Sequence, residues 1–160
     1  MQFLFFCFLH FLQLAGKFPG KDGFTMKQEY LQLIQRAAAA RKNAYAPYSG
    51  FAVGAALLCA DGTVFTGCNV ENASYPAGIC AERSALFAAV SAGKRRFSAI
   101  AIAAGEDPTA PCGICRQALA EFGKLDVLCA NQDGSRCRMF SLRELLPEAF
   151  SLLPPASPKG

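Results

Sequence analysis

The chain has 160 residues, of which 52% are hydrophobic and 18% charged, with a formal net charge of +4. This length is sufficient for one domain with a substantial core, and the low charged fraction leaves apolar surface that an oligomer would bury. The small positive charge does not indicate a nucleic-acid-binding protein, because its compact cluster, Lys94-Arg95-Arg96, is typical of a solvated loop.

The first 25 residues differ from the rest of the chain. Residues 1–14 are a dense run of phenylalanine and leucine that is too short to span a bilayer comfortably, and no lysine or arginine precedes it as in a signal peptide. Met26 opens an amphipathic helix pattern, which favours an over-extended start with residues 1–25 as a non-core leader. A signal or anchor, and a genuine functional extension, stay open as alternatives. We expect the folded domain at residues 26–150 and a loose, proline-rich tail at residues 151–160.

The first half of the folded part is predicted to form a helix, a hairpin and a second helix. Residues Gln28–Asn43 carry large apolar side chains and alanines at helical spacing. The runs Val53–Ala60 and Thr63–Val70 flank Asp61-Gly62, a dipeptide typical of a tight hairpin turn. Residues Ile79–Ser91 are rich in helix formers.

The second half continues with strands and shorter helices. Ser98–Ala104 is an apolar run typical of a buried strand, and Gly113–Phe122 has the pattern of a helix. Two short strands are expected at Val127–Ala130 and Cys137–Phe140, and Ser141 can cap a final helical segment. The order α-β-β-α-β-α-β-β-α predicts an α/β fold with a mixed five-stranded sheet and two helices packed on it.

Two short stretches carry the strongest functional signal: Cys80-Ala81-Glu82-Arg83 and Pro111-Cys112-Gly113-Ile114-Cys115-Arg116-Gln117. They place three cysteines about thirty residues apart, two of them in a C-x-x-C, with a glutamate two residues after the first. A structural zinc site usually has four protein ligands, whereas a catalytic one has three and an open position for water. The arrangement matches the signature of zinc deaminases, in which the glutamate is not a ligand. We therefore predict one Zn²⁺ per subunit, bound by Cys80, Cys112 and Cys115.

The residue types also fit the chemistry of deamination. Zinc makes water nucleophilic at neutral pH, and removal of the amine from a cytosine ring also needs protons at N3 and at the departing nitrogen. Glu82 is the candidate carrier of these protons. Both stretches lie at predicted helix N-termini, where the dipole favours thiolates. Because three thiolates leave the site net negative, Arg83 and Arg116 are candidates to donate hydrogen bonds to sulfur.

The remaining cysteines do not form a disulfide framework. Cys59, Cys68 and Cys129 lie in apolar, strand-like runs, Cys7 lies in the leader, and Cys137 begins a late strand. Without a small-domain cysteine pattern, a reducing compartment is the better interpretation, which predicts a cytoplasmic protein. The alternative is that the leader acts as a signal or anchor.

The segment from Tyr45 to Phe150, about two thirds of the chain, resembles the small homotetrameric cytidine deaminases of pyrimidine salvage. The matching stretches are Tyr48–Leu57, Gly67–Ala73, Tyr75–Arg83, Pro111–Gln117 and Glu144–Phe150. The first two and the last extend beyond the metal signature and separate this family from nucleic-acid editors. The resemblance implies a cytidine deaminase-like three-layer fold, with the zinc-binding helices packed on the sheet.

The resemblance also implies an activity and a set of contacts. The activity is hydrolysis of cytidine and deoxycytidine to the uracil nucleosides and ammonia. Asn69 and Glu71 would hold the ribose 3′-hydroxyl, Phe51 would stack on the pyrimidine, and the Ala81 backbone would contact the base. Phe150 would reach a neighbouring subunit's site in a homotetramer. The implied partners are a nucleoside and further copies of the chain, with no nucleic acid and, for the folded domain, no membrane.

Several alternatives stay open at this point. The three cysteines could be buried thiols or a purely structural zinc site, although the sole histidine, His10, lies in the leader and is no obvious fourth ligand. Taken alone, Glu82 is an ordinary acid in a first helical turn, and Phe51 and Phe150 are ordinary packing aromatics. The substrate could be another small cytosine compound, such as an antibiotic nucleoside. From a different class, the chain could be a non-enzymatic zinc-binding interaction module.

Overall fold

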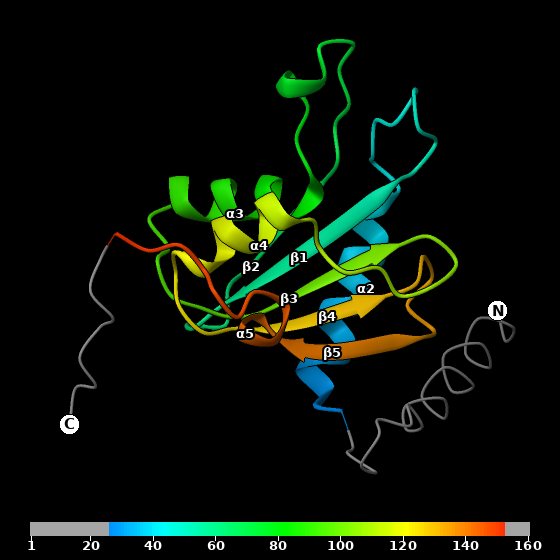
Figure 1. Cartoon of the computed structure of the whole chain (residues 1–160). Coiled ribbons are helices and arrows are strands. Elements are labelled where there is room, and N and C mark those ends of the chain that lie inside the picture. Colours follow the sequence, from blue (N-terminus) through cyan, green and yellow to red (C-terminus); the bar gives the residue numbers. More distant parts are fainter. Residues whose placement is uncertain (1–25, 153–160) are drawn as a thin grey trace, which may run out of the picture.

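One mixed β-sheet supports the helices that carry the metal motif (Figure 1). The computed structural model describes residues 26–152. Helix α2 covers one face of the sheet, and α3 and α4 cover the other (Figure 1). The elements are α2 (Gln28–Arg41), β1 (Val53–Cys59), β2 (Val64–Cys68), a 3₁₀ turn η1 (Tyr75–Ala77), α3 (Ala81–Ser91), β3 (Phe97–Ala104), α4 (Gly113–Ala120), β4 (Asp126–Ala130), β5 (Cys137–Ser141) and α5 (Leu142–Leu145). The predicted order of helices and strands and the mixed, three-layer α/β fold are confirmed.

The strand order in the sheet is β2-β1-β3-β4-β5. Strands β1 and β2 form the predicted antiparallel hairpin, and Gly62 has the positive φ of +85° that its turn requires. Strand β3 runs antiparallel to β1 and parallel to β4, because α4 forms the crossover between β3 and β4. The sheet is therefore mixed, and helix α4, which carries Cys115 and which we call the metal helix, lies in the connection between the parallel strands β3 and β4.

Alternation along the strands divides the interior into two cores. Larger side chains face α3 and α4, among them Leu57, Ile100 and Ile102, which pack with Leu86 of α3. The face toward α2 is lined mainly by alanines, and this lets the helix lie close to the sheet. Those alanines are Ala56, Ala99, Ala101, Ala103 and Ala130.

Two glycines permit helices to approach the strands more closely than a side chain would allow. A Cβ atom at Gly54 would lie 2.1 Å from the carbonyl oxygen of Ala37 in α2. At Gly67 of β2, a Cβ would lie 2.6 Å from the carbonyl oxygen of Ala81, the first residue of α3. Both distances are far below contact, so neither site has room for a methyl group. Gly67 thus lets the N-terminus of α3, with Cys80 before it, sit directly on the sheet.

The structure corrects details of the predicted boundaries. Helix α3 begins at Ala81 rather than Ile79, because Cys80 has the extended backbone of an N-cap residue. The 3₁₀ turn η1 at Tyr75–Ala77 was not predicted; it lies in the loop that projects beyond the sheet edge (Figure 1). The predicted cap at Ser141 is present as a full capping box with Glu144.

Several expectations fall outside the described residues. These concern the leader at residues 1–25, including Cys7 and His10, and the tail beyond Leu152. Among residues 26–152, no helix has the length and hydrophobicity that crossing a membrane requires.

Candidate metal centre and cleft

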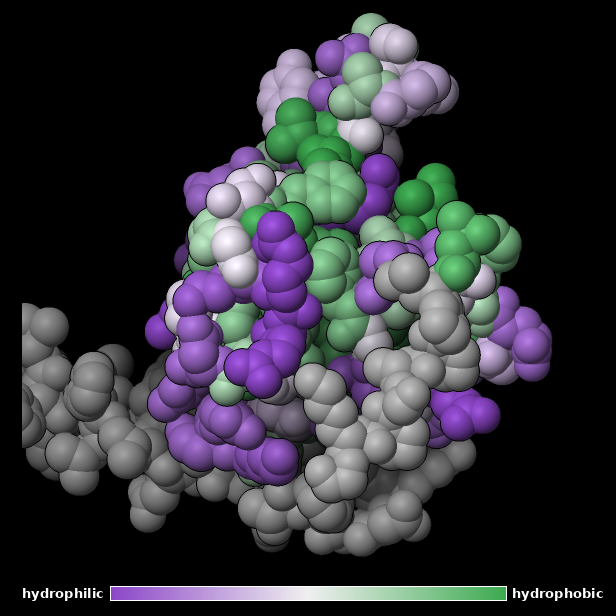
Figure 2. Space-filling model, turned by 90° about the vertical axis from the view of Figure 1, so that its left-hand side faces the viewer, coloured by the Kyte–Doolittle hydropathy of each residue, from purple (hydrophilic) through white to green (hydrophobic). Residues whose placement is uncertain are grey.

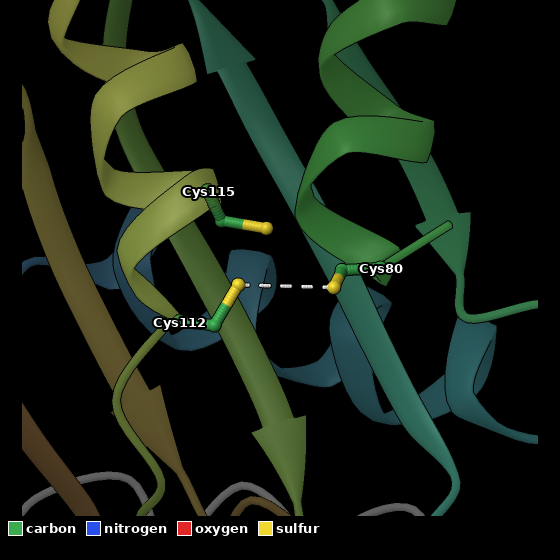
Figure 3. Close-up of side chains that lie close together, drawn as sticks. All are labelled: Cys80, Cys112 and Cys115. Carbon is green, nitrogen blue, oxygen red and sulfur yellow. Dashed lines mark hydrogen bonds between the residues drawn. The ribbon is translucent and has the colours of Figure 1, made fainter. Parts of the chain in front are cut away.

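Three cysteine side chains converge where helices α3 and α4 begin (Figure 3). Cys80 is the N-cap of α3, Cys112 is the N-cap of α4, and Cys115 lies in the first turn of α4. Their sulfur atoms all lie within 4.8 Å of one another. Between Cys80 and Cys112 the distance from Sγ to Sγ is 3.8 Å. Within the described residues, this is the one cluster of metal-binding side chains of this kind.

The sulfur geometry fits a tetrahedral zinc ion. With Zn–S bonds of about 2.3 Å, two sulfurs of a tetrahedral site lie roughly 3.8 Å apart, which matches the observed separation. The three sulfurs come from two helix N-termini, where the dipole and the unpaired amide groups stabilise negative charge. Residues Cys80, Cys112 and Cys115 therefore offer three ligands in the arrangement that a catalytic zinc site uses.

The electrostatics of the site favour a thiolate at Cys80. Its pKa is lowered to about 5, chiefly through hydrogen bonding with Cys115, with further contributions from Arg83 and Cys112. Hydrogen bonding to Cys80 and burial raise the pKa of Cys115 in turn. The Nη2 of Arg83 donates to the Cys80 sulfur at 3.6 Å, so the predicted hydrogen bond from Arg83 to a cysteine of the cluster is present. Its buried Nε has no hydrogen-bond partner among the described residues.

Glu82 is one of two buried polar or charged residues in the described part of the chain, with 5% of its surface exposed. It lies in the first turn of α3, two residues after Cys80 and facing the cleft. Burial raises the pKa of its carboxyl group above the ordinary value, and the negative charge of Cys80 raises it further. A carboxyl group with a raised pKa holds a proton more readily than an exposed one, which suits a proton carrier.

A cleft of about 670 Å³ opens over Cys80, Cys112 and Glu82. Its lining includes the residues predicted to contact a nucleoside, apart from Phe150: Phe51, Asn69, Glu71 and Ala81. Phe51 is 43% exposed, whereas an aromatic residue of the core would be buried. The structure thus brings together the metal motif and the distant Tyr48–Leu57 and Gly67–Ala73 stretches.

Glu71 and Asn69 also organise the wall of this cleft. The Glu71 carboxylate accepts hydrogen bonds from the backbone of Tyr48 at 2.9 Å and of Ser49 at 3.2 Å, and from the Ser49 hydroxyl. The Asn69 amide accepts from the backbone of Val53 and donates to the carbonyl of Phe51. These bonds fix the loop that carries Phe51. Each side chain keeps hydrogen-bonding capacity, since an amide nitrogen has two hydrogens and a carboxylate about four acceptor positions.

Sequence reasoning assigned no role to two residues that this loop depends on. Ser49 accepts a hydrogen bond from the backbone of Phe51 while its own hydroxyl donates to Glu71. Tyr48 lines the cleft and supplies a backbone donor. Both lie in the Tyr48–Leu57 stretch, whose match to a known family was the signal available for them.

Arg116 does not have the predicted partner. Its Nε donates to the carbonyl of Pro111 at 2.7 Å and its Nη1 to the carbonyl of Leu145 at 3.0 Å, rather than to a cysteine sulfur. The side chain is occupied in joining two backbone segments, so we correct this prediction. Phe150 is 69% exposed and lies outside the lining of the cleft in its own chain.

Comparison with known proteins places this geometry in a defined context. The family model for the cytidine and deoxycytidylate deaminase zinc-binding region matches residues 27–131. A cytidine deaminase of Sporosarcina psychrophila is 50% identical over 123 residues, which are 75% of this chain and 90% of that protein. A probable cytidine deaminase of Dictyostelium discoideum is 45% identical over 129 residues, 79% of this chain and 87% of that protein.

Solved structures give the same result. The crystal structure of a cytidine deaminase from Burkholderia pseudomallei superimposes with a TM-score of 0.72 and 52% identity, covering 78% of this chain and 100% of that one. The cytidine deaminase of Mycobacterium tuberculosis gives a TM-score of 0.65 at 43% identity, covering 79% of this chain and 100% of that one. The matched region of the family model contains the three cysteines and Glu82.

Proposed function

The chain belongs to the zinc-dependent cytidine deaminase family, and we propose that it converts cytidine and deoxycytidine to uridine and deoxyuridine with release of ammonia. The observation that carries this proposal is the convergence of three cysteine sulfurs beside a buried glutamate in an open cleft. The reaction serves pyrimidine salvage.

Cys80, Cys112 and Cys115 would hold the zinc ion as thiolates. When bound, zinc supplies a Lewis acid that makes water a competent nucleophile at neutral pH. The chain's own contribution is to limit the negative charge of three thiolates. Arg83 does this directly through its hydrogen bond to Cys80, and the two helix N-termini add their dipoles.

Glu82 would carry the protons of the reaction. Its carboxylate would take a proton from the attacking water and deliver it to N3 of the ring. It would then take the remaining proton from the hydroxyl group formed on C4 and deliver it to the departing amino nitrogen, which leaves C4 as a carbonyl. Attack forms a bond between water oxygen and C4, and release of ammonia breaks the bond between C4 and nitrogen. The raised pKa of Glu82 supports this role, because the group has to be both base and acid within one turnover.

The remaining cleft residues would position the nucleoside. Phe51 offers an exposed ring against which a pyrimidine can stack, and the Ala81 backbone lies at the start of α3 next to the metal ligands. Asn69 and Glu71 would bind the ribose 3′-hydroxyl with the capacity that their loop contacts leave. A 3′-linked polynucleotide lacks that free hydroxyl, so we expect free nucleosides to be the substrates.

We also propose that the chain assembles as a homotetramer in which Phe150 reaches a neighbour's cleft. Several large apolar side chains are exposed around the cleft and on the adjoining helices, and Figure 2 shows hydrophobic residues grouped on one face. The large apolar or aromatic residues with exposed surface include Tyr45, Tyr48, Tyr75, Phe87, Ile114 and Phe150. Dilution should lower specific activity as subunits separate. Light scattering that finds a fully active monomer would refute the assembly.

We also propose that the protein is located in the cytoplasm. The cysteines within the described residues are free thiols, which suits a reducing compartment, and three of them are the proposed zinc ligands. Fractionation of cells that express the full chain would test it. Recovery of the protein with exported or membrane fractions would instead support the leader as a signal or anchor.

The direct test of the activity is ammonia release by the purified full chain. We expect cytidine and deoxycytidine to yield stoichiometric ammonia and uracil nucleoside, whereas single-stranded DNA and RNA yield none. A preference for a cytosine-containing antibiotic over cytidine would instead favour a deaminase that acts on antibiotic nucleosides. A zinc-loaded protein that releases no ammonia from any of these compounds would be an interaction module.

A further inference from the structure

Gln117, two positions after the proposed metal ligand Cys115, forms hydrogen bonds with the segment that follows α5. The side-chain amide of Gln117 donates from Nε2 to the carbonyl oxygen of Phe150 at 2.8 Å. Its Oε1 accepts from the backbone nitrogen of the same residue at 3.1 Å. One amide thus satisfies both backbone groups of Phe150, as a neighbouring strand would do in a sheet.

A second tether lies one residue earlier in α4. The Arg116 guanidinium joins the carbonyl of Pro111, just before ligand Cys112, to the carbonyl of Leu145 at the end of α5. Arg116 and Gln117, two consecutive residues of α4, therefore hold residues 145–150 at both ends, at Leu145 and at Phe150.

This fixation does not serve to bury the aromatic ring. Phe150 is 69% exposed, so its backbone is held at both polar groups while its side chain stays in solvent. Chain ends are usually loose unless something ties them down. A bond pair that fixes only the backbone of an exposed phenylalanine determines where that ring is presented.

We propose that Gln117 is a positioning residue that sets the place of the Phe150 ring relative to the metal helix. The inference rests on the proposed function of Phe150, which is to complete the cleft of a neighbouring copy. Because Gln117 and Cys115 share one helix, the presented ring keeps a fixed relation to the metal centre of its own chain. The two hydrogen bonds between Gln117 and the backbone of Phe150 form a clamp. This clamp acts through the position of Phe150 and not on the reacting atoms.

The test is a double-variant cycle on the full, zinc-loaded protein. Gln117→Met keeps the length of the side chain and removes both hydrogen bonds. We expect it to raise the KM for cytidine about tenfold, with kcat within about twofold and zinc content unchanged. In the Phe150→Ala background the same substitution should change KM by less than about twofold, because the ring that it positions is already absent. Gln35→Met, on the exposed face of α2, is the matched control and should leave KM unchanged.

Two results would overturn the proposal. One is an equal factor on KM with and without the Phe150 ring, which indicates a general effect on the fold. The other is an unchanged KM in the Gln117→Met protein. Ammonia release by the unsubstituted protein reports separately on the proposed activity, so failure of the clamp leaves that activity established.

Amide hydrogen exchange tests the hydrogen bonds between Gln117 and Phe150 without a measurement of enzymatic activity. Exchange in the peptide that contains Phe150 should accelerate about tenfold in Gln117→Met and stay unchanged in Gln35→Met. Unchanged exchange in the Gln117→Met protein would overturn the clamp even if the enzyme were inactive for another reason.

Discussion

The guanidinium group of Arg83 donates a hydrogen bond from Nη2 to the sulfur of Cys80 across 3.6 Å. Three thiolates give a divalent ion a net negative surrounding, and a hydrogen bond to sulfur withdraws part of that charge. We therefore expect the link between Arg83 and Cys80 to tune the proposed metal centre from the same helix turn that supplies one of its proposed ligands.

Replacement of this arginine should weaken the site without unfolding the chain. In Arg83→Met we expect activity or zinc affinity to fall about 10–100-fold, as is usual for outer partners of metal ligands. Steady-state kinetics and zinc analysis on the same sample measure both quantities. Arg36→Met, at an exposed position of α2, is the control and should match the unsubstituted protein. Normal kcat and normal zinc affinity in Arg83→Met would contradict the role.

Loss of one ligand should abolish metal binding. The unsubstituted protein should contain one zinc per chain. Cys112→Ala should lose most of its zinc, because the two thiolates that remain do not complete a catalytic site. Cys68→Ala removes a thiol from β2 that bonds to the carbonyl of Asn43, and it should keep its zinc. Full zinc content in Cys112→Ala, measured by elemental analysis, would refute the ligand assignment.

The role of Glu71 can be tested with a substrate that lacks one hydroxyl group. If Glu71 and Asn69 bind the 3′-hydroxyl, 3′-deoxycytidine should react with kcat/KM at least about tenfold below that of cytidine, because each side chain, once covered by the substrate, lacks one hydrogen-bond partner. In Glu71→Gln the KM for cytidine should rise and this discrimination should shrink. Glu121→Gln, at the exposed end of α4, serves as the control. Equal discrimination in Glu71→Gln and the control would place the hydroxyl elsewhere.

The stability of the fold should fall at high pH through a tyrosine far from the cleft. The Tyr30 hydroxyl donates to Asp126 at 2.7 Å, and its pKa is raised above the usual range, first by burial and then by this hydrogen bond. Its stabilisation is therefore complete below the unfolded pKa of about 10 and is lost above it, where the unfolded chain releases the proton first.

Tyr30→Phe isolates this contribution. At pH 7 we expect the variant to be less stable by about 1 kcal/mol, the usual net value of a hydrogen bond. Urea unfolding of both proteins between neutral pH and pH 11 should show the difference narrowing from about pH 10 upward. A difference that widens over that range would show that the sign of the pKa shift is wrong.

Local patterns in the sequence were enough to predict the elements and the cluster of three cysteines. The cysteine spacing and the N-terminal positions of Cys80 and Cys112 in their helices depend on residues close in sequence, and the structure brings these two side chains together with Cys115. The three-residue turn at Tyr75–Ala77 escaped prediction because it is too short to show a helical period.

The contacts that could not be predicted join distant segments through backbone groups. Arg116 bonds to the carbonyl of Leu145, and every residue offers such a carbonyl, so the sequence contains no signal for that partner. The same is true of Glu71, whose bonds to the backbone of Tyr48 and Ser49 depend on the hairpin register that brings the loop beside it.

The most direct test of the account is the Glu82→Gln protein, assayed for ammonia release and zinc content in one preparation. Glutamine has the size of glutamate but cannot take a proton from water. We predict one zinc per chain, an intact fold and turnover reduced by about 10²–10⁴-fold or more. Turnover close to normal in the zinc-loaded protein would contradict the assignment of Glu82 as the proton carrier.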